Sequence, residues 1–443
     1  MNIQLSEHFT YGKLLKFTFP SIIMMVFTSI YGVVDGVFVS NFVGSESFAA
    51  VNLIMPFLMI LGAIGFMLGT GGSALVAFIL GTGDGQKANR VFSLMVYVLI
   101  VLGGIFMVGG ILFMEPMARL LGADEAMLPV CVRYGRIVML GLIPFMLQNT
   151  FQSFLVTAER PHFGLYITIA AGVTNMALDA LFVGVFRWGV AGAAAATVIS
   201  QIVGGVIPLV YFICPNKSKL RLGKTKMDFR MLGKAAANGS SEFMTNVSMS
   251  LVNMLYNWQL MRLIGAQGVA IFGIIMYVSF IFAAIFIGYS MGSAPVIGFH
   301  YGAGNKEELK GLFRKSLWIL LVFSVVLTGL AMMLAKPLAM IFVAYDAELL
   351  ELTKRALTIY SLAFLMSGFN IFASSFFTAL NDGLTSALIS FGRTLMFQVA
   401  SVLLLPLIFD VDGIWAAVIL AEGLALILSA VCVIRNRKKY GYA

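Results

Sequence analysis

The stretch Thr174-Asn175-Met176-Ala177-Leu178-Asp179 places a carboxamide and a carboxylate in the middle of an apolar run from about residue 164 to residue 186. Asn175 and Asp179 are four residues apart, so on a helix they share one face, one turn apart. A charge at the centre of a bilayer costs about 3 kcal/mol or more. The stretch therefore predicts a membrane-spanning helix whose carboxylate needs a partner.

Two further acids are placed in a similar way. Asp35 lies within the apolar run 14–42, and Glu242 lies near the start of the run that ends near residue 263. Ionisable residues inside membrane spans usually face a bundle interior or a wet cavity. The rest of the chain is therefore interpreted as a scaffold that brings these acids to such a cavity.

The composition predicts an integral membrane protein. Of the 443 residues, 60% are hydrophobic and 11% are charged, whereas a soluble domain is nearer half apolar and a quarter charged. The net charge of +9 does not indicate nucleic-acid binding, because the basic residues fall in short segments between apolar runs. The cysteines and histidines are scattered along the chain, at Cys131, Cys214, Cys432, His8, His162 and His300. This spacing favours three buried cysteines and predicts neither a metal site nor a disulfide.

Twelve apolar runs are long enough to cross the hydrocarbon core of a bilayer. Their approximate limits are 14–42, 47–79, 91–114, 128–157, 163–186, 190–214, 232–263, 267–300, 314–344, 353–380, 384–409 and 413–434. Most of the 29 Lys and Arg residues fall in segments on one side of this scheme. The positive-inside rule therefore predicts that both termini are cytoplasmic.

An internal repeat divides the chain into two lobes. At an offset of about 221 residues, Gly81 matches Gly302 and Asn149 matches Asn370. Six spans per repeat give parallel repeats around a central cleft, the architecture of an alternating-access transporter. We expect an N-lobe at residues 1–214, a basic cytoplasmic linker at 215–230 and a C-lobe at 231–443.

Several segments carry a family resemblance. They are Pro20, Tyr31–Ser40, Asn175–Asp179, Gly189–Thr197, Gly288–Asn305, Gly413–Ala417 and Glu422. Together they resemble the multidrug and toxic compound extrusion (MATE) family along essentially all twelve spans. The resemblance implies a cation-coupled antiporter, and not an enzyme, that exports amphipathic and often cationic compounds. It implies no cofactor, with H⁺ or Na⁺ as the coupling ion.

The resemblance also implies an ion-coupling site in the N-lobe. The positions that match the family's N-lobe site are Asp35, Asn175, Asp179 and Thr197. Carboxylate, amide and hydroxyl oxygens suit Na⁺, and a pair of buried carboxyls can also hold a proton, so both ions remain open. The alternative is that the acids pair with neighbouring helices for structure alone.

Other polar residues within the spans have two interpretations each. Glu242 resembles a second acidic site of some family members, although water near the membrane surface could also solvate it. Arg393 is the one basic residue within a span, and Glu422 is its candidate partner, either as a structural pair or in the cleft wall. Candidate cleft-lining residues are Gln148, Asn149, Gln152, Asn253, Asn257, Asn370 and Arg393, but hydrogen bonds between helices would explain some of them.

The alternative function is a flippase for lipid-linked precursors, because related two-lobed families share this topology. A flippase for an anionic pyrophosphate lipid should carry several cations in its cleft, and only Arg393 is placed for that role. The turn Gly81-Thr-Gly-Asp-Gly85 lacks the Lys-Ser/Thr ending of a P-loop, so neither nucleotide nor nucleic acid is expected as a partner. We expect a monomer in the plasma membrane whose partners are small amphipathic substrates and lipid.

Overall fold

A computed structural model describes residues 3–43, 45–344 and 346–442. The first half of the chain forms α1 (Tyr11–Phe42), α2 (Ser45–Gly81), α3 (Gly85–Leu112), α4 (Met114–Leu120), α5 (Leu128–Leu140), α6 (Leu142–Thr157), α7 (Pro161–Asp179), the π-helical turn η1 (Ala180–Val185) and α8 (Gly189–Ile213). The second half forms α9 (Phe229–Ile264), α10 (Ala266–Gly302), α11 (Lys306–Val343), α12 (Ala347–Ser361), α13 (Phe364–Ala379), α14 (Gly383–Phe391), the π-helical turn η2 (Gly392–Met396), α15 (Phe397–Leu404) and α16 (Pro406–Tyr440). The described residues contain no strand, which confirms the all-α prediction.

Most of these helices can cross a membrane. Within the described ranges, nine are long and apolar enough, or eleven if the bent pairs α5–α6 and α12–α13 each form one span. The pairs bend by 54° and 47°. Helix α9, the seventh expected span, has 36 residues but a more polar sequence, which includes Lys234, Glu242 and Arg262. The multi-pass membrane architecture is therefore confirmed.

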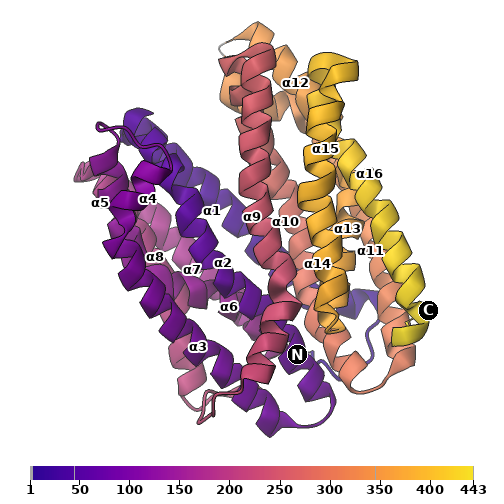
Figure 1. The fold of residues 1–443 in the computed structure, drawn as a ribbon. Coiled ribbons are helices and arrows are strands. Elements are labelled where there is room, and N and C mark those ends of the chain that lie inside the picture. The colour runs from indigo at the N-terminus through magenta and orange to yellow at the C-terminus, as the bar shows by residue number, and fades with distance from the viewer. Residues whose placement is uncertain (1–2, 44, 345, 443) are drawn as a thin grey trace.

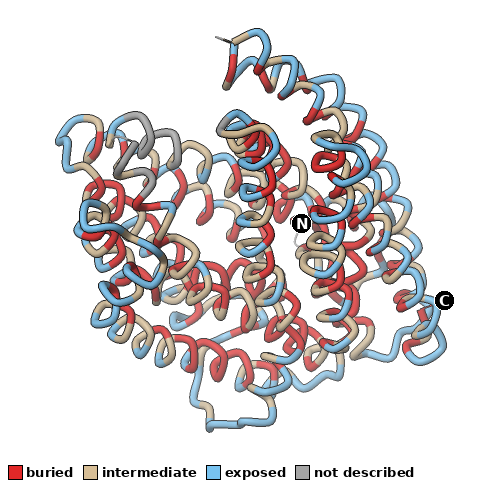
Figure 2. Tube along the Cα trace, turned by 45° about the horizontal axis from the view of Figure 1, so that its top comes forward, coloured by how far each residue is buried: buried red, intermediate tan, exposed pale blue. Residues whose placement is uncertain are grey.

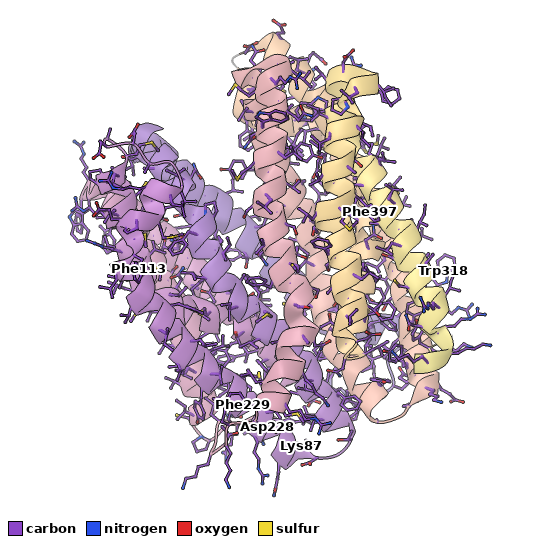
Figure 3. All side chains as sticks on the ribbon, in the orientation of Figure 1. Lys87, Phe113, Asp228, Phe229, Trp318 and Phe397 are labelled. Carbon is purple, nitrogen blue, oxygen red and sulfur yellow. The ribbon has the colours of Figure 1, made fainter. Side chains whose placement is uncertain are left out.

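The outer surface is apolar, as contact with lipid requires. Exposed residues follow the outer sides of the helices (Figure 2). On α3, Val101 is 61% exposed, Ile105 is 60% exposed and Leu112 is 67% exposed. These three residues share one helix face, and Phe113 and Trp318 likewise project outward in Figure 3. Apolar stripes this long would be unfavourable in water, so they are expected to face acyl chains.

Two groups of helices form the molecule, one from each half of the chain. In Figure 1 the groups α1–α8 and α9–α16 lie close together at one end and splay apart toward the other. The loop 214–228 joins them at the close end, where Lys87, Asp228 and Phe229 are labelled in Figure 3. One apolar core lies mainly in the first group and one lies in the second, and a third core joins the N-terminal segment and α1 to helices of the second group.

Helices α2 and α9 approach each other backbone to backbone at the close end. A Cβ atom on Gly239 would overlap the carbonyl oxygen of Met67, and one on Gly71 would overlap the carbonyl oxygen of Ala235. Only glycine allows so close an approach. We call the close glycine contacts of α2 with α9, of α2 with α10 and of α1 with α10 the glycine seam.

Glycine also allows close backbone contact where α10 meets the first lobe. A Cβ atom on Gly302 would overlap the Phe78 carbonyl oxygen, and one on Gly81 would overlap the Phe299 carbonyl oxygen. The two contacts are reciprocal, as expected for a repeat that pairs Gly81 with Gly302. A Cβ atom on Gly288 would lie 2.7 Å from the carbonyl oxygen of Ser21 on α1, so close packing extends along both sides of the lobe interface.

The N-terminal segment before α1 bridges the two lobes at this end. Leu5 and Phe9 are fully buried. The backbone N–H of Leu5 donates to Glu159 at 2.8 Å, and that of Phe9 donates to Glu308 at 2.9 Å. Glu159 follows α6, and Glu308 lies in the first turn of α11. The segment is therefore anchored to both halves of the chain.

The C-terminal turn is anchored through Asp382, which lies between α13 and α14. Its carboxylate accepts hydrogen bonds from the Tyr440 hydroxyl at 2.6 Å and the Thr385 hydroxyl at 2.9 Å. Burial alone would raise the pKa of this carboxyl, but these bonds and the nearby Lys439 ammonium hold the pKa below its usual range. Cys131 and Cys432 are buried, whereas Cys214 is exposed, because it follows the end of α8. The expectation of three buried cysteines was therefore wrong for Cys214.

Candidate ion-coupling site

Helix α7 places the predicted carboxamide and carboxylate inside the N-lobe. Asn175 is 2% exposed and Asp179 is fully buried. They lie one turn apart on the face that packs toward the lobe interior, as the four-residue spacing predicts. Asp179 is the last residue of α7, and the wider turn η1 begins directly after it. Such π-helical turns are frequent at functional sites.

Asp35 on α1 meets this pair. Its carboxylate interacts with both Asp179 and Asn175. Among the described residues, both carboxylate oxygens of Asp179, the Oδ1 of Asp35 and the Oδ1 of Asn175 are buried without a well-formed hydrogen bond. Neither acid is in a salt bridge of the described part of the chain. Two carboxyls held together at low dielectric repel strongly when both are ionised, so this cluster can accept a cation or a proton.

Thr197 lies on the wall of a cavity of about 50 Å³ beside this cluster. The cavity wall also includes Gln201 and Tyr134, and the Tyr134 hydroxyl lies within electrostatic range of both Asp35 and Asp179. The Thr197 hydroxyl itself donates to the Ala193 carbonyl of its own helix at 3.0 Å. Asp35, Asn175 and Asp179 are therefore brought together, and Thr197 occupies the adjoining wall.

Sequence reasoning missed three polar residues of this region. Gln201 and Tyr134 line the cavity, and the Tyr31 side chain hydrogen-bonds to Gln148. Two of the three had a signal in the sequence. Tyr31 precedes Asp35 by one turn, and Gln201 matches Glu422 at the repeat offset of about 221 residues.

The candidate cleft-lining residues separate into two groups. Gln148, Asn149 and Gln152 on α6 are each 7% exposed, so they lie within the N-lobe. On α9, Asn253 is half-buried and Asn257 is exposed. Their neighbours on the other face of α9 hydrogen-bond within the C-lobe, where Tyr256 donates to Gln398 at 3.2 Å and Gln259 donates to the Val402 carbonyl at 3.2 Å.

The C-lobe contains a buried ionic network around Glu422. The Arg393 Nε lies 2.8 Å from Glu422 Oε1, and the Asn370 amide donates to Glu422 Oε2 at 2.7 Å. Ser429 donates to Asn370 Oδ1 at 3.0 Å. Arg393 therefore has the predicted partner, and Asn370 uses its amide inside the lobe, which favours a structural role for both.

Glu242 lies deeper than the sequence indicated. Helix α9 begins at Phe229, so Glu242 is about 20 Å along the helix at 1.5 Å per residue. The side chain is half-buried and lies within electrostatic range of Arg393. Glu242 is thus a neighbour of the ionic network around Arg393.

The potential ligand atoms of the acidic cluster are all oxygens. The described residues contain no group of three or more His, Cys, Asp or Glu side chains that could hold a metal ion. The acidic cluster offers two carboxylates and an amide oxygen, which are hard oxygen ligands. Such a set can exchange a cation or a proton.

Buried acids inside two lobes of membrane-spanning helices are typical of membrane transporters. A family model, MatE, matches residues 20–181 and 243–403, which is most of the chain and both lobes. The chain belongs to the MatE family, the multidrug and toxic compound extrusion transporters.

Curated relatives and solved structures extend this result. The chain is 23% identical over 424 residues to the multidrug export protein MepA of Staphylococcus saprophyticus, covering 95% of this chain and 91% of the relative. It is 22% identical over 430 residues to MepA of Staphylococcus aureus, covering 96% and 93%.

The fold is similar to a solved outward-facing multidrug resistance MATE transporter, with a TM-score of 0.91, 21% identity and coverage of 99% and 98%. A MATE structure in a bent conformation gives a TM-score of 0.86 at 21% identity, with coverage of 98% and 96%.

Proposed function

We propose that this chain is a cation-coupled antiporter that exports amphipathic, often cationic small molecules by alternating access. The observation that carries the proposal is the pair Asp35 and Asp179, buried together with unpaired oxygens and no basic partner among the described residues. Relatives named as multidrug export proteins support the class of substrate. The coupling ion is H⁺ or Na⁺.

The cycle follows from the charge of the acidic cluster. A proton or Na⁺ that enters from outside neutralises the repulsion between Asp35 and Asp179 and changes the hydrogen bonding between α1 and α7. This change lowers the affinity for bound substrate, which leaves toward the outside. The lobes then reopen toward the cytoplasm, the ion is released, and a new substrate binds.

The arrangement of the lobes fits the outward-facing stage of this cycle. The glycine seam closes the end that carries the basic loop 214–228, and the positive-inside rule places that end in the cytoplasm. The opposite ends of the lobes diverge (Figure 1). We place both termini in the cytoplasm, the chain in the plasma membrane and the transporter as a monomer.

The flippase alternative receives no support from the C-lobe. Arg393 is the only cation expected within a span, and it is engaged by Glu422 at 2.8 Å. A cleft for an anionic pyrophosphate would need free positive charge at that depth.

Ethidium efflux from vesicles with a pH gradient or a Na⁺ gradient imposed separately tests the proposal. We expect one gradient to drive efflux, and we expect Asp35→Asn and Asp179→Asn to abolish it while membrane insertion is retained. Asp84→Asn is the matched control, because Asn caps a helix as well as Asp does and Asp84 only caps α3. Full activity of the double variant, or efflux driven by ATP without a gradient, would refute the mechanism.

A further inference from the structure

A second cavity lies far from the acidic cluster. It has a volume of about 250 Å³ and lies where α7 begins, against α1 and the N-terminal segment. Its wall includes Lys16 and Phe17 from α1 and Arg160, His162 and Phe163 from the start of α7. Lys16 precedes Asp35 by nineteen residues, or about 28 Å along a helix. The cavity is therefore separate from the proposed coupling site.

The cavity wall carries unneutralised positive charge. Lys16 is exposed and forms no salt bridge with any residue that the structure describes. Arg160 donates one N–H to the Lys217 carbonyl at 3.1 Å, which leaves most of its five donors free. Glu159, the carboxylate among the described lining residues, is already paired with Lys219 at 2.8 Å and accepts the Leu5 N–H. An anion would thus meet two free cations.

The local backbone adds to this preference. Helix α7 begins at Pro161 with no hydrogen bond from a capping side chain. Pro161 has no N–H, and the N–H groups of Phe163 and Gly164 donate to the Arg160 carbonyl at 3.1 and 3.2 Å, so the start of the helix contributes the positive end of its dipole and the His162 N–H. His162 adds a further donor from the first turn. Charge, donors and volume together fit a phosphodiester.

Two apolar stripes continue from this basic cavity along the outer surface. On α7, Tyr166 and Val173 follow His162 on the same face and are 64% and 50% exposed. On α1, Phe19 follows Lys16 by one turn and is 59% exposed. Because α1 and α7 pack against each other, both stripes begin at the same basic cavity. A ligand that fits both parts has an anionic head and long apolar chains.

We propose that this cavity binds the headgroup of an anionic phospholipid from the cytoplasmic leaflet, with its acyl chains along Phe19, Tyr166 and Val173. Basic pockets between spans at the cytoplasmic surface attract anionic headgroups, and each Lys or Arg contributes about 1 kcal/mol. Aromatic side chains such as Tyr166 are favoured at the boundary between headgroups and acyl chains. The lipid would pack α1, the N-terminal segment and the start of α7 together.

Native mass spectrometry of the purified full-length protein, with phosphatidylglycerol or phosphatidylcholine supplied in detergent, tests this site. We expect wild type to retain phosphatidylglycerol preferentially and the variant Lys16→Gln/Arg160→Gln to bind it about 30-fold more weakly, the change that corresponds to about 1 kcal/mol per charge. Lys87→Gln/Arg90→Gln removes the same charge from exposed positions on α3 at the same end. This control should bind like wild type.

Three results would overturn the proposal. They are equal retention of the two lipids, an equal loss of binding in the Lys87→Gln/Arg90→Gln control, and competition by soluble glycerophosphoglycerol as strong as that by the lipid. The last result would indicate a phosphate site that does not use the apolar stripes. If the double variant is unstable, Lys16→Gln alone should weaken lipid binding about fivefold, because Lys16 is exposed and unpaired; unchanged binding would refute the site.

Discussion

Replacing Arg393 by Met should destabilise the C-lobe strongly, because the change strands a buried carboxylate. The Glu422 side chain is 4% exposed, and the Arg393 Nε lies 2.8 Å from it. Met keeps the unbranched apolar stem of Arg without its guanidinium, so Glu422 would keep only the Asn370 amide at 2.7 Å. Removing one partner of a buried ion pair typically costs about 3–5 kcal/mol. The loss should be smaller in Arg393→Met/Glu422→Gln, where no unpaired charge remains at this pair.

The assay is unfolding in mixed micelles with increasing sodium dodecyl sulfate, followed by circular dichroism. Lys354→Met is the control, since Lys354 is 40% exposed in its pair with Glu351 and exposed pairs contribute about 0–1 kcal/mol. A cost below about 1 kcal/mol for Arg393→Met would refute the buried-pair reasoning. So would a double variant as unstable as the single one.

Three further predictions concern the interface, the C-terminal turn and the N-terminal segment. Gly239→Ala should widen the α2–α9 contact, measured as a longer spin-label distance between the lobes, whereas Gly233→Ala on the same helix has open space and should not. Asp382→Asn should lower the thermal stability at pH 7. Because the Asp382 pKa is lowered by folding, its contribution is complete above the ordinary Asp value of about 3.9 and lost as the pH falls through the folded value, so the variant and wild type should converge there. Phe9→Ala should cost about 3–5 kcal/mol in the micelle assay, because Phe9 is fully buried, whereas Phe229→Ala, at a 76% exposed position, should change stability by less than about 0.5 kcal/mol; equal effects would contradict the assigned burial.

The fold was predictable because hydrophobic length and periodicity are local properties of the chain. Apolar runs gave the spans, and the repeat indicated two lobes. The bends within spans were harder to predict from the sequence. The 54° bend between α5 and α6 occurs at Gly141, yet glycines elsewhere in this chain lie within regular helix. Whether a glycine bends a helix depends on packing by neighbours that are distant in sequence.

The acidic cluster was predictable in part for the same reason. Asn175 and Asp179 share a face because of their spacing, and Asp35 was noticed because a charge in an apolar run is costly. The positions of Tyr134 and Gln201 depend on how α5 and α8 pack, and neither residue type is unusual in a span. The N-terminal segment was interpreted only as polar, because the burial of Leu5 and Phe9 requires surfaces from both lobes.

The two lobes use the same scaffold for different electrostatic purposes. At the repeat offset of about 221 residues, Glu422 of the C-lobe corresponds to Gln201, and Asn370 corresponds to Asn149. In the C-lobe, Arg393 neutralises Glu422, whereas the N-lobe acids lack a basic partner among the described residues. A change in bound ion would therefore alter the charge of the N-lobe far more than that of the C-lobe.

The glycine seam also affects the energetics of opening. Where Gly71 and Gly239 or Gly81 and Gly302 meet, the surfaces in closest contact are peptide groups. Parting them wets amides, which water solvates well, instead of methyl groups, whose exposure costs about 25 cal/mol per Å². No side-chain rotamer needs to be unlocked at these points. At these glycine contacts the lobes can therefore fit closely when shut and still separate at a small cost in free energy.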